Sequence, residues 1–186
     1  MIIVGGVAGG MSAATRLRRL NEQAEIVVVE RSGYVSFANC GLPYHVGGVI
    51  EQRRSLLLQT PESLAARFNL DVRVHTEAVS IDREQRVAHL RHVETGETEA
   101  LGYDRLILSP GARPVRPPLP GIERALSRRD IEDTDAMVAA TEGAATAAVI
   151  GGGFIGVEMA ENLLHRGLNV ALIEAADERE EALAIA

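Results

Sequence analysis

Short apolar runs alternate with amphipathic stretches along the chain, separated by glycine and proline. Residues 2–5 form an apolar run that ends in glycine, which is typical of a buried parallel strand. In residues 9–21 apolar side chains recur at every third position, with arginines off that stripe or at its edge, and this predicts a helix. Residues 25–30 form the next apolar run. The pattern therefore predicts a strand–helix–strand unit at the start of the chain.

The middle of the chain combines one helix with several strands. Residues 60–68 are predicted to be a helix with a threonine cap and a proline in its first position. Short strand-like runs fill residues 71–101, with a hairpin turn predicted at residues 95–96. Residues 103–108 form another apolar strand, which a Ser-Pro-Gly sequence ends.

The strand–helix–strand pattern returns near the end of the chain. Residues 113–121 carry four of the seven prolines and are predicted to be a linker, and residues 131–142 are predicted to be a helix. Residues 147–150, 154–166 and 169–174 then repeat the order of the N-terminal unit. The whole pattern predicts an α/β protein with two Rossmann-like units.

Both units carry glycines at the turn between strand and helix. Dinucleotide-binding turns use three glycines and an acidic residue at the end of the next strand, and the second unit matches fully with Gly151, Gly153, Gly156 and Glu174. The alternative interpretation is a glycine-rich turn in an ordinary α/β unit.

The first unit departs from this fingerprint at one position. Gly5, Gly10 and Glu30 match, but Val7 stands where the middle glycine belongs. A valine there has to point away from the pyrophosphate, or the ligand has to lie farther out.

The chain has a single cysteine, Cys40, in the sequence SFANCGLPY of residues 36–44. Gly41 and Pro43 suit a turn that opens a short helix, and a thiolate is stabilised at a helix N-terminus. The segment leaves the carboxyl edge of the predicted sheet, where open α/β sheets bind ligands. A redox thiol without a second cysteine has to use an external thiol or stop at the sulfenic acid. The alternative is a buried cysteine that acts as a small hydrophobic residue.

Composition narrows the possible partners. The net charge of −7 argues against a general nucleic-acid binder, and no apolar run reaches the roughly 18–20 residues of a membrane span. The start of the chain lacks the features of a signal peptide, and one cysteine fits a reducing cytoplasm. The five histidines show no metal-ligand spacing, so no metal site is expected.

Four segments together resemble one enzyme family. They are GGVAGGMSAA at residues 5–14, SFANCGLPY at 36–44, YDRLILSPGARP at 103–114 and IEDTDAM at 131–137. The chain resembles the coenzyme A disulfide reductases, a single-cysteine branch of the FAD-dependent pyridine nucleotide-disulfide oxidoreductases. Related NADH oxidases and peroxidases are similar, but typically carry Ser-Cys in place of Asn39-Cys40.

The resemblance implies a Rossmann-like FAD/NAD(P)-binding fold and two cofactors, FAD and NADH or NADPH. The residues that it implies for FAD are Gly5, Gly6, Val7, Ala8, Gly9, Gly10, Glu30, Arg31, Val79, Ser109, Gly111 and Arg129. The residues that it implies for the nicotinamide nucleotide are Gly151, Gly153, Ile155, Gly156 and Glu174.

The resemblance also implies a substrate, the disulfide or persulfide of coenzyme A, with Cys40 as the catalytic thiol. The residues that match the coenzyme A channel are Ser12, Arg16, Arg19, Ser36 and Asn39. One further basic contact of the family falls at or near Phe68, beside Arg67. For Arg16 and Arg19 the alternative is a solvated helix face.

The family's chains continue beyond the segments matched here, with the second half of the flavin domain and a dimerisation domain. The expected division is a first part of an FAD domain in residues 1–112, a linker and helix in 113–145, and the opening of an NAD(P) domain in 146–186. We therefore expect a fragment or truncated product of a homodimeric reductase, marginally stable alone, with an acidic tail at 177–186 that is mobile or loosely helical.

Three functions remain open from the sequence. The first is an NAD(P)H-dependent flavoprotein that reduces a disulfide or persulfide of coenzyme A through Cys40. The second is an NADH oxidase or peroxidase in which Cys40 cycles through sulfenic acid. The third is a partial nucleotide-binding module without catalytic activity.

Overall fold

A computed structural model describes residues 1–175 of the chain. The acidic tail at 177–186 lies outside the described residues. None of the helices in the described part is long and apolar enough to cross a membrane.

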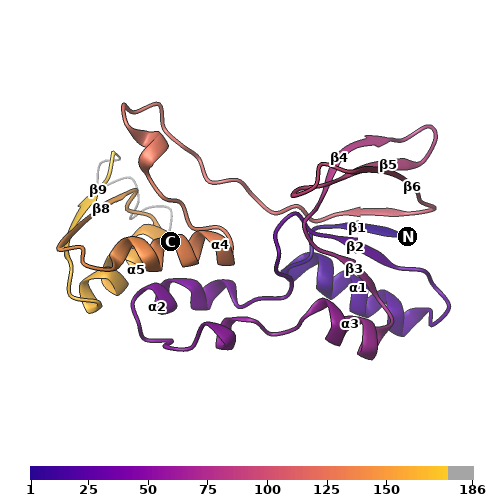
Figure 1. The fold of residues 1–186 in the computed structure, drawn as a ribbon, viewed down its shortest axis with the longest axis horizontal. Helices are drawn as coiled ribbons and strands as arrows, with labels where there is room; N and C mark the ends of the chain where they lie inside the picture. Colours follow the sequence, from indigo (N-terminus) through magenta and orange to yellow (C-terminus); the bar gives the residue numbers. More distant parts are fainter. Residues whose placement is uncertain (176–186) are drawn as a thin grey trace, which may run out of the picture.

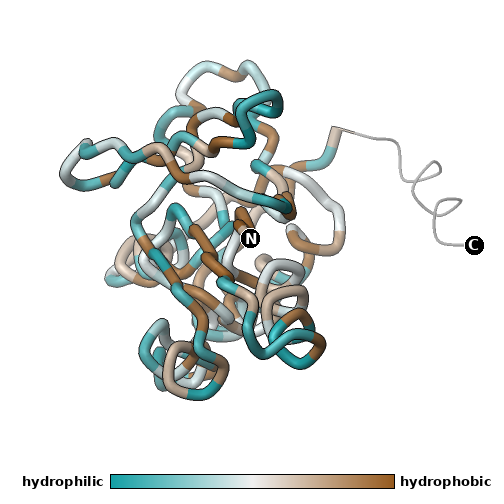
Figure 2. Tube along the Cα trace, turned by 90° about the vertical axis from the view of Figure 1, so that its right-hand side faces the viewer, coloured by the Kyte–Doolittle hydropathy of each residue, from teal (hydrophilic) through white to brown (hydrophobic). Residues whose placement is uncertain are grey.

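A four-stranded parallel sheet forms the centre of the N-terminal part. Its strands, in spatial order, are β3 (Asp71–Arg73), β2 (Val27–Val29), β1 (Ile2–Val4) and β7 (Leu106–Leu108). All neighbouring pairs are parallel. Strands β2 and β7 are shorter than the apolar runs predicted at 25–30 and 103–108. Figure 2 shows hydrophobic stretches, in brown, close to the N-terminus in the middle of the view.

Helices α1 (Ala8–Leu20) and α3 (Pro61–Phe68) lie along one face of this sheet (Figure 1). Their apolar faces enclose a cluster that includes Ile3, Ala14 and Leu64, all essentially inaccessible to solvent. The cap predicted for α3 is present, because the Thr60 side chain accepts a hydrogen bond from the Ser63 backbone N–H.

One detail of α1 differs from the sequence prediction. Leu20 was expected on the apolar stripe but is 66% exposed, whereas Arg18 is buried. The Arg18 guanidinium donates hydrogen bonds to the carbonyl oxygens of Phe68 and Asn69, each at 2.8 Å. Arg18 is buried because it satisfies carbonyls that the end of α3 leaves without helical partners.

An antiparallel meander covers the opposite face of the parallel sheet. It consists of β4 (Thr76–Asp82), β5 (Val87–His92) and β6 (Thr98–Gly102). Ala88 and Leu90 of β5 pack against Ile2 and Val29 of the sheet, and all four are buried. The turn predicted at residues 95–96 joins β5 to β6, with Gly96 at a φ of 74°.

The second half of the chain forms a smaller unit around a two-stranded sheet. Its elements are α4 (Ile131–Thr141), β8 (Thr146–Ile150), α5 (Phe154–His165) and β9 (Asn169–Ile173). Strands β8 and β9 are parallel, as the repeated pattern predicted. Short 3₁₀ turns occur at Asn39–Gly41, Arg53–Leu56 and Ile122–Arg124.

Helix α2 (Leu42–Val46) belongs by sequence to the first half but lies beneath α4 and α5 (Figure 1). The segment that leaves β2 therefore reaches across to the second unit before the chain returns to α3.

Candidate functional site

The first glycine turn leaves no room for side chains between β1 and α1. Gly5 has a φ of 100°, a conformation that favours glycine. A Cβ on Gly10 would overlap the carbonyl oxygen of Gly5, so only glycine lets the helix start this close to the strand. These are the roles of the first and third glycines of a dinucleotide-binding turn.

The acidic residue at the end of β2 is held against this turn. The Gly6 N–H donates to Glu30 Oε2 at 2.7 Å, and the Ser32 N–H donates to Glu30 Oε1 at 3.0 Å. The carboxylate is thus fixed beside the glycine turn, where a ribose would lie. Val7, which replaces the middle glycine, packs against a buried cluster that includes Phe37 and Leu42.

A cleft of about 640 Å³ opens in front of the turn. Among the residues that the sequence associated with FAD, those that line it are Val7, Ala8, Gly9, Glu30, Arg31, Ser109, Gly111 and Arg129. Gly5, Gly6 and Gly10 form the turn behind it. Val79 is not in its lining: this residue lies at a bulge of β4 and is 47% exposed.

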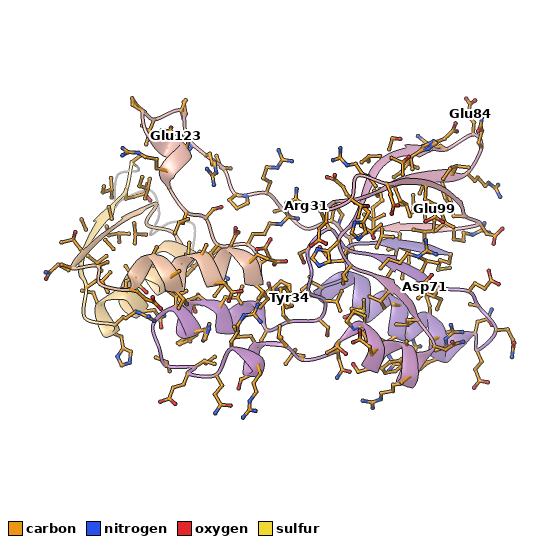
Figure 3. All side chains as sticks on the ribbon, in the orientation of Figure 1. Arg31, Tyr34, Asp71, Glu84, Glu99 and Glu123 are labelled. Carbon is orange, nitrogen blue, oxygen red and sulfur yellow. The ribbon has the colours of Figure 1, made fainter. Side chains whose placement is uncertain are left out.

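Arginines dominate the charge of the cleft. Arg31, Arg113, Arg128 and Arg129 line it, against two acidic residues, Glu30 and Asp130. In Figure 3, Arg31 lies where the two halves of the chain meet. Guanidinium groups pair well with phosphates, so this composition suits a pyrophosphate. Sequence reasoning found Arg31 and Arg129 but missed the other two arginines.

Two of these arginines also bind backbone around the cleft. Arg129 Nη2 donates to the Pro110 carbonyl at 2.9 Å, just after β7. Arg128 Nη1 donates to the Asn39 carbonyl at 3.1 Å, and its Nε is buried without a partner among the described residues. The backbone N–H of Arg129 donates to Asp133 at 2.8 Å. Burial raises the pKa of the Asp133 carboxyl above its usual value, and the charge of Asp130 adds to this shift.

Cys40 lies in the 3₁₀ turn that runs directly into α2, and it is exposed. Its neighbour Asn39 lines the cleft. The Ser36 N–H donates to the Gly6 carbonyl at 2.9 Å, which joins the cysteine segment to the glycine turn. The segment that carries the predicted thiol is therefore bonded directly to the predicted phosphate-binding turn.

The residues matched to the coenzyme A channel fall into two groups. Ser36 and Asn39 lie on the cysteine segment. Ser12, Arg16 and Arg19 are exposed on one face of α1, the helix that begins at the cleft. This placement agrees with a substrate contact and equally with the alternative, a solvated helix face.

The further basic contact of the family was matched to the neighbourhood of Phe68. There the Arg67 guanidinium lies over the ring of Phe68, 5.2 Å from its centroid. Arg67 is therefore held by a neighbour on its own helix.

The second glycine turn repeats the geometry of the first. Gly151 has a φ of 105°, and a Cβ on Gly156 would overlap the Gly151 carbonyl oxygen. The Gly152 N–H donates to Glu174 Oε2, as Gly6 does to Glu30. This arrangement is suited to a second nucleotide.

A second cavity of about 770 Å³, largely apolar, lies beside this turn and includes Gly153 and Ile155 in its lining. Ile155 also lines the first cleft, so the two hollows meet at this residue.

Helix α4 binds the residues on either side of the cysteine segment, residues 36–44. Sequence reasoning did not foresee this contact. Arg53 forms a two-point ion pair with Asp135 at 2.7 Å, and its guanidinium lies over the Tyr34 ring. The ion pair raises the pKa of Arg53. Glu132 accepts a hydrogen bond from the Gly33 N–H at 2.8 Å. Tyr34 marks this junction in Figure 3. The IEDTDAM segment thus docks α4 on the cysteine segment.

Within residues 1–175, no three His, Cys, Asp or Glu side chains gather as a metal site would require.

A family model for pyridine nucleotide-disulphide oxidoreductases matches residues 1–183. A coenzyme A disulfide reductase from Staphylococcus epidermidis is 40% identical over 176 residues, which cover 93% of this chain and 40% of that protein. The chain therefore spans about 40% of the length of this curated relative.

Two solved structures show the same fold. The reduced Bacillus anthracis CoADR-RHD is 54% identical with a TM-score of 0.91, over 94% of this chain and 32% of that one. An NAD-dependent persulfide reductase from A. fulgidus is 38% identical with a TM-score of 0.89, over 95% of this chain and 33% of that one.

Proposed function

Because the chain belongs to the pyridine nucleotide-disulphide oxidoreductase family, whose members depend on FAD and NAD(P)H, we propose that it carries the sites of a coenzyme A disulfide or persulfide reductase. The observation that carries this proposal is the hydrogen bond from Ser36 to Gly6, which joins the segment of the single cysteine to a glycine turn of dinucleotide-binding geometry. The names of the relatives support the choice of substrate.

The cleft beside the first turn fits FAD. Its glycines let β1 and α1 approach at positions where any Cβ would overlap neighbouring atoms, Glu30 is fixed where ribose hydroxyls would bind, and the arginines supply positive charge for a pyrophosphate. When bound, FAD accepts hydride from the nicotinamide and supplies the electron pair that regenerates the Cys40 thiolate.

The second turn would hold the nicotinamide nucleotide. Gly151, Gly153 and Gly156 would face its pyrophosphate, and Glu174 would accept a hydrogen bond from the ribose 2′-hydroxyl. Ile155 lines both hollows, so a nucleotide at this turn would lie next to the first cleft.

Cys40 performs the covalent step. Its thiolate attacks one sulfur of the coenzyme A disulfide, a bond forms between Cys40 and that sulfur, and one coenzyme A thiolate leaves. Cleavage of this mixed disulfide needs two electrons, which NAD(P)H would supply through the flavin, and it would release the second coenzyme A as a thiolate and return the Cys40 thiolate. Ser12, Arg16 and Arg19 would contact the substrate along α1.

The rest of the proposal concerns the whole protein. We propose the division already expected, with an FAD domain beginning in residues 1–112, a linker and helix in 113–145, and an NAD(P) domain beginning in 146–186. We also propose that the whole protein is a homodimer, and that its unpaired thiol functions in the reducing cytoplasm.

The test measures cofactor content and turnover. We expect the purified protein to be yellow, to release FAD on denaturation, and to oxidise NADH with coenzyme A disulfide or persulfide as acceptor. Turnover with oxygen or hydrogen peroxide alone would instead favour the oxidase or peroxidase alternative. A colourless protein that takes up no FAD on reconstitution would favour the non-catalytic module and refute the proposal.

A further inference from the structure

Helix α2, which directly follows Cys40, has one end in each of two hydrophobic clusters. Its first residue, Leu42, is fully buried with Phe37 in the cluster beside the cleft. Its last residue, Val46, is fully buried with Leu163 of α5 in the cluster of the second unit. A short helix therefore connects the cysteine to the core of the nucleotide-binding unit that follows.

Two arginines from the later part of the chain bind the backbone at either end of this segment. Arg166 Nη1 donates to the Val46 carbonyl at 2.8 Å, where the end of the helix leaves carbonyls without helical partners. Arg128 Nη1 donates to the Asn39 carbonyl, immediately before Cys40. The cysteine thus lies between two backbone positions that other parts of the fold hold in place.

The end of α2 approaches α5 so closely that only glycine fits there. A Cβ on Gly47 would lie 2.5 Å from Asn162 Oδ1 and 2.8 Å from Asn162 Cβ. Asn162 is 5% exposed, and its Nδ2 donates to the Glu158 carbonyl at 2.8 Å. Because Asn162 is enclosed and bonded, a larger residue at position 47 has to push the two helices apart.

Helix α5 begins at the second glycine turn. Asn162 lies in its last turn, and Arg166 directly follows its last residue. We propose that the docking of α5 on α2 orients Cys40, and that Gly47, Asn162 and Arg166 are positioning residues for the thiol. This rests on the proposed function only in that Cys40 is the redox group. The rigid helix would link the placement of the nucleotide-binding turn to that of the cysteine.

The test is direct because Cys40 is the single cysteine of these 186 residues, and iodoacetamide therefore labels one thiol in this chain. We expect Gly47→Ala and Arg166→Met to change the labelling rate by about fivefold or more, the lower range of coupling between protein sites, because the reactivity of the exposed Cys40 thiol depends on the surroundings that its fixed position gives it. Asn162→Ala, combined with Gly47→Ala, removes the Oδ1 overlap and should restore the rate in part. Arg166→Lys keeps a donor and should lie nearer to the wild type.

The matched controls are Gly102→Ala, at a position with open space around it, and Arg105→Met, at an exposed arginine whose side chain donates a hydrogen bond to the adjacent Asp104 carbonyl. Labelling rates for Gly47→Ala and Arg166→Met that equal those of the controls would overturn the proposal.

Circular dichroism shows whether each variant is folded. If Gly47→Ala unfolds, the labelling rates of Arg166→Met and Arg166→Lys test the proposal instead. Arg166→Met removes one hydrogen bond of a partly exposed side chain, so this variant should stay folded. Labelling needs neither flavin nor turnover, so a failure of the reductase assay leaves this test intact.

Discussion

Replacing Ile131 with alanine should destabilise the junction that holds the cysteine segment. Ile131 is the first residue of α4, is fully buried, and packs with Phe37 and Leu42 of that segment and with Leu56. The change removes three buried carbons, which at about 0.8 kcal/mol each corresponds to about 2.4 kcal/mol of transfer free energy. A cavity left in the cluster would add to this, giving a total loss of about 2–5 kcal/mol in the free energy of unfolding.

Urea denaturation followed by circular dichroism measures this loss, provided that the slope against urea does not change. Ile131→Val should cost about 0.5–1.5 kcal/mol, because it removes one carbon. The matched control is Ile173→Ala, which removes the same atoms from a side chain that is 52% exposed. If Ile131→Ala cost no more than Ile173→Ala, the cluster would not stabilise the junction, and the reasoning from burial would be wrong.

Four further predictions follow from the site. Cys40→Ser should abolish reduction of coenzyme A disulfide while FAD binding, measured by absorbance, stays intact; near-normal turnover would show that the thiol is structural. NADH should be preferred to NADPH, because the Glu174 carboxylate repels a 2′-phosphate, and an equal or higher kcat/KM with NADPH would contradict this. Asp133→Asn should raise the free energy of unfolding at pH 7, because the raised pKa of Asp133 means that its charged form is disfavoured in the folded state. The gain should vanish as the pH falls below about 4, where the carboxyl is protonated in both states. A gain that persists at low pH would show that the charge is not its cause. Gly10→Ala should weaken FAD binding at least about tenfold, because a Cβ there overlaps the Gly5 carbonyl and has to displace the turn that faces the cleft. The cost of this overlap exceeds the roughly 1 kcal/mol by which alanine is more favourable than glycine in a helix. An unchanged affinity in a fluorescence titration would refute this prediction.

The local sequence determined the two strand–helix–strand units and the glycine turns within them. The glycine turns and the acidic residues two dozen positions later were visible because hydrophobic period and backbone freedom are local properties. Gly151 and Glu174 therefore appear in the structure in the relation that the pattern predicted. The sequence also singled out Cys40, because its polar neighbours and the following glycine and proline are local signals, and its role as the redox thiol stays a prediction.

Only the tertiary structure decided what surrounds these elements. Arg128 lines the first cleft because the chain folds back after the linker, and nothing in its own sequence marks it. Arg18 is buried because a second helix ends beside it, which helical periodicity cannot show. The position of α2 between two hydrophobic clusters depends on residues more than a hundred positions apart, such as Val46 and Arg166. Such contacts follow from the packing of distant segments, whereas the turns and strands that they join follow from the order of residues along the chain.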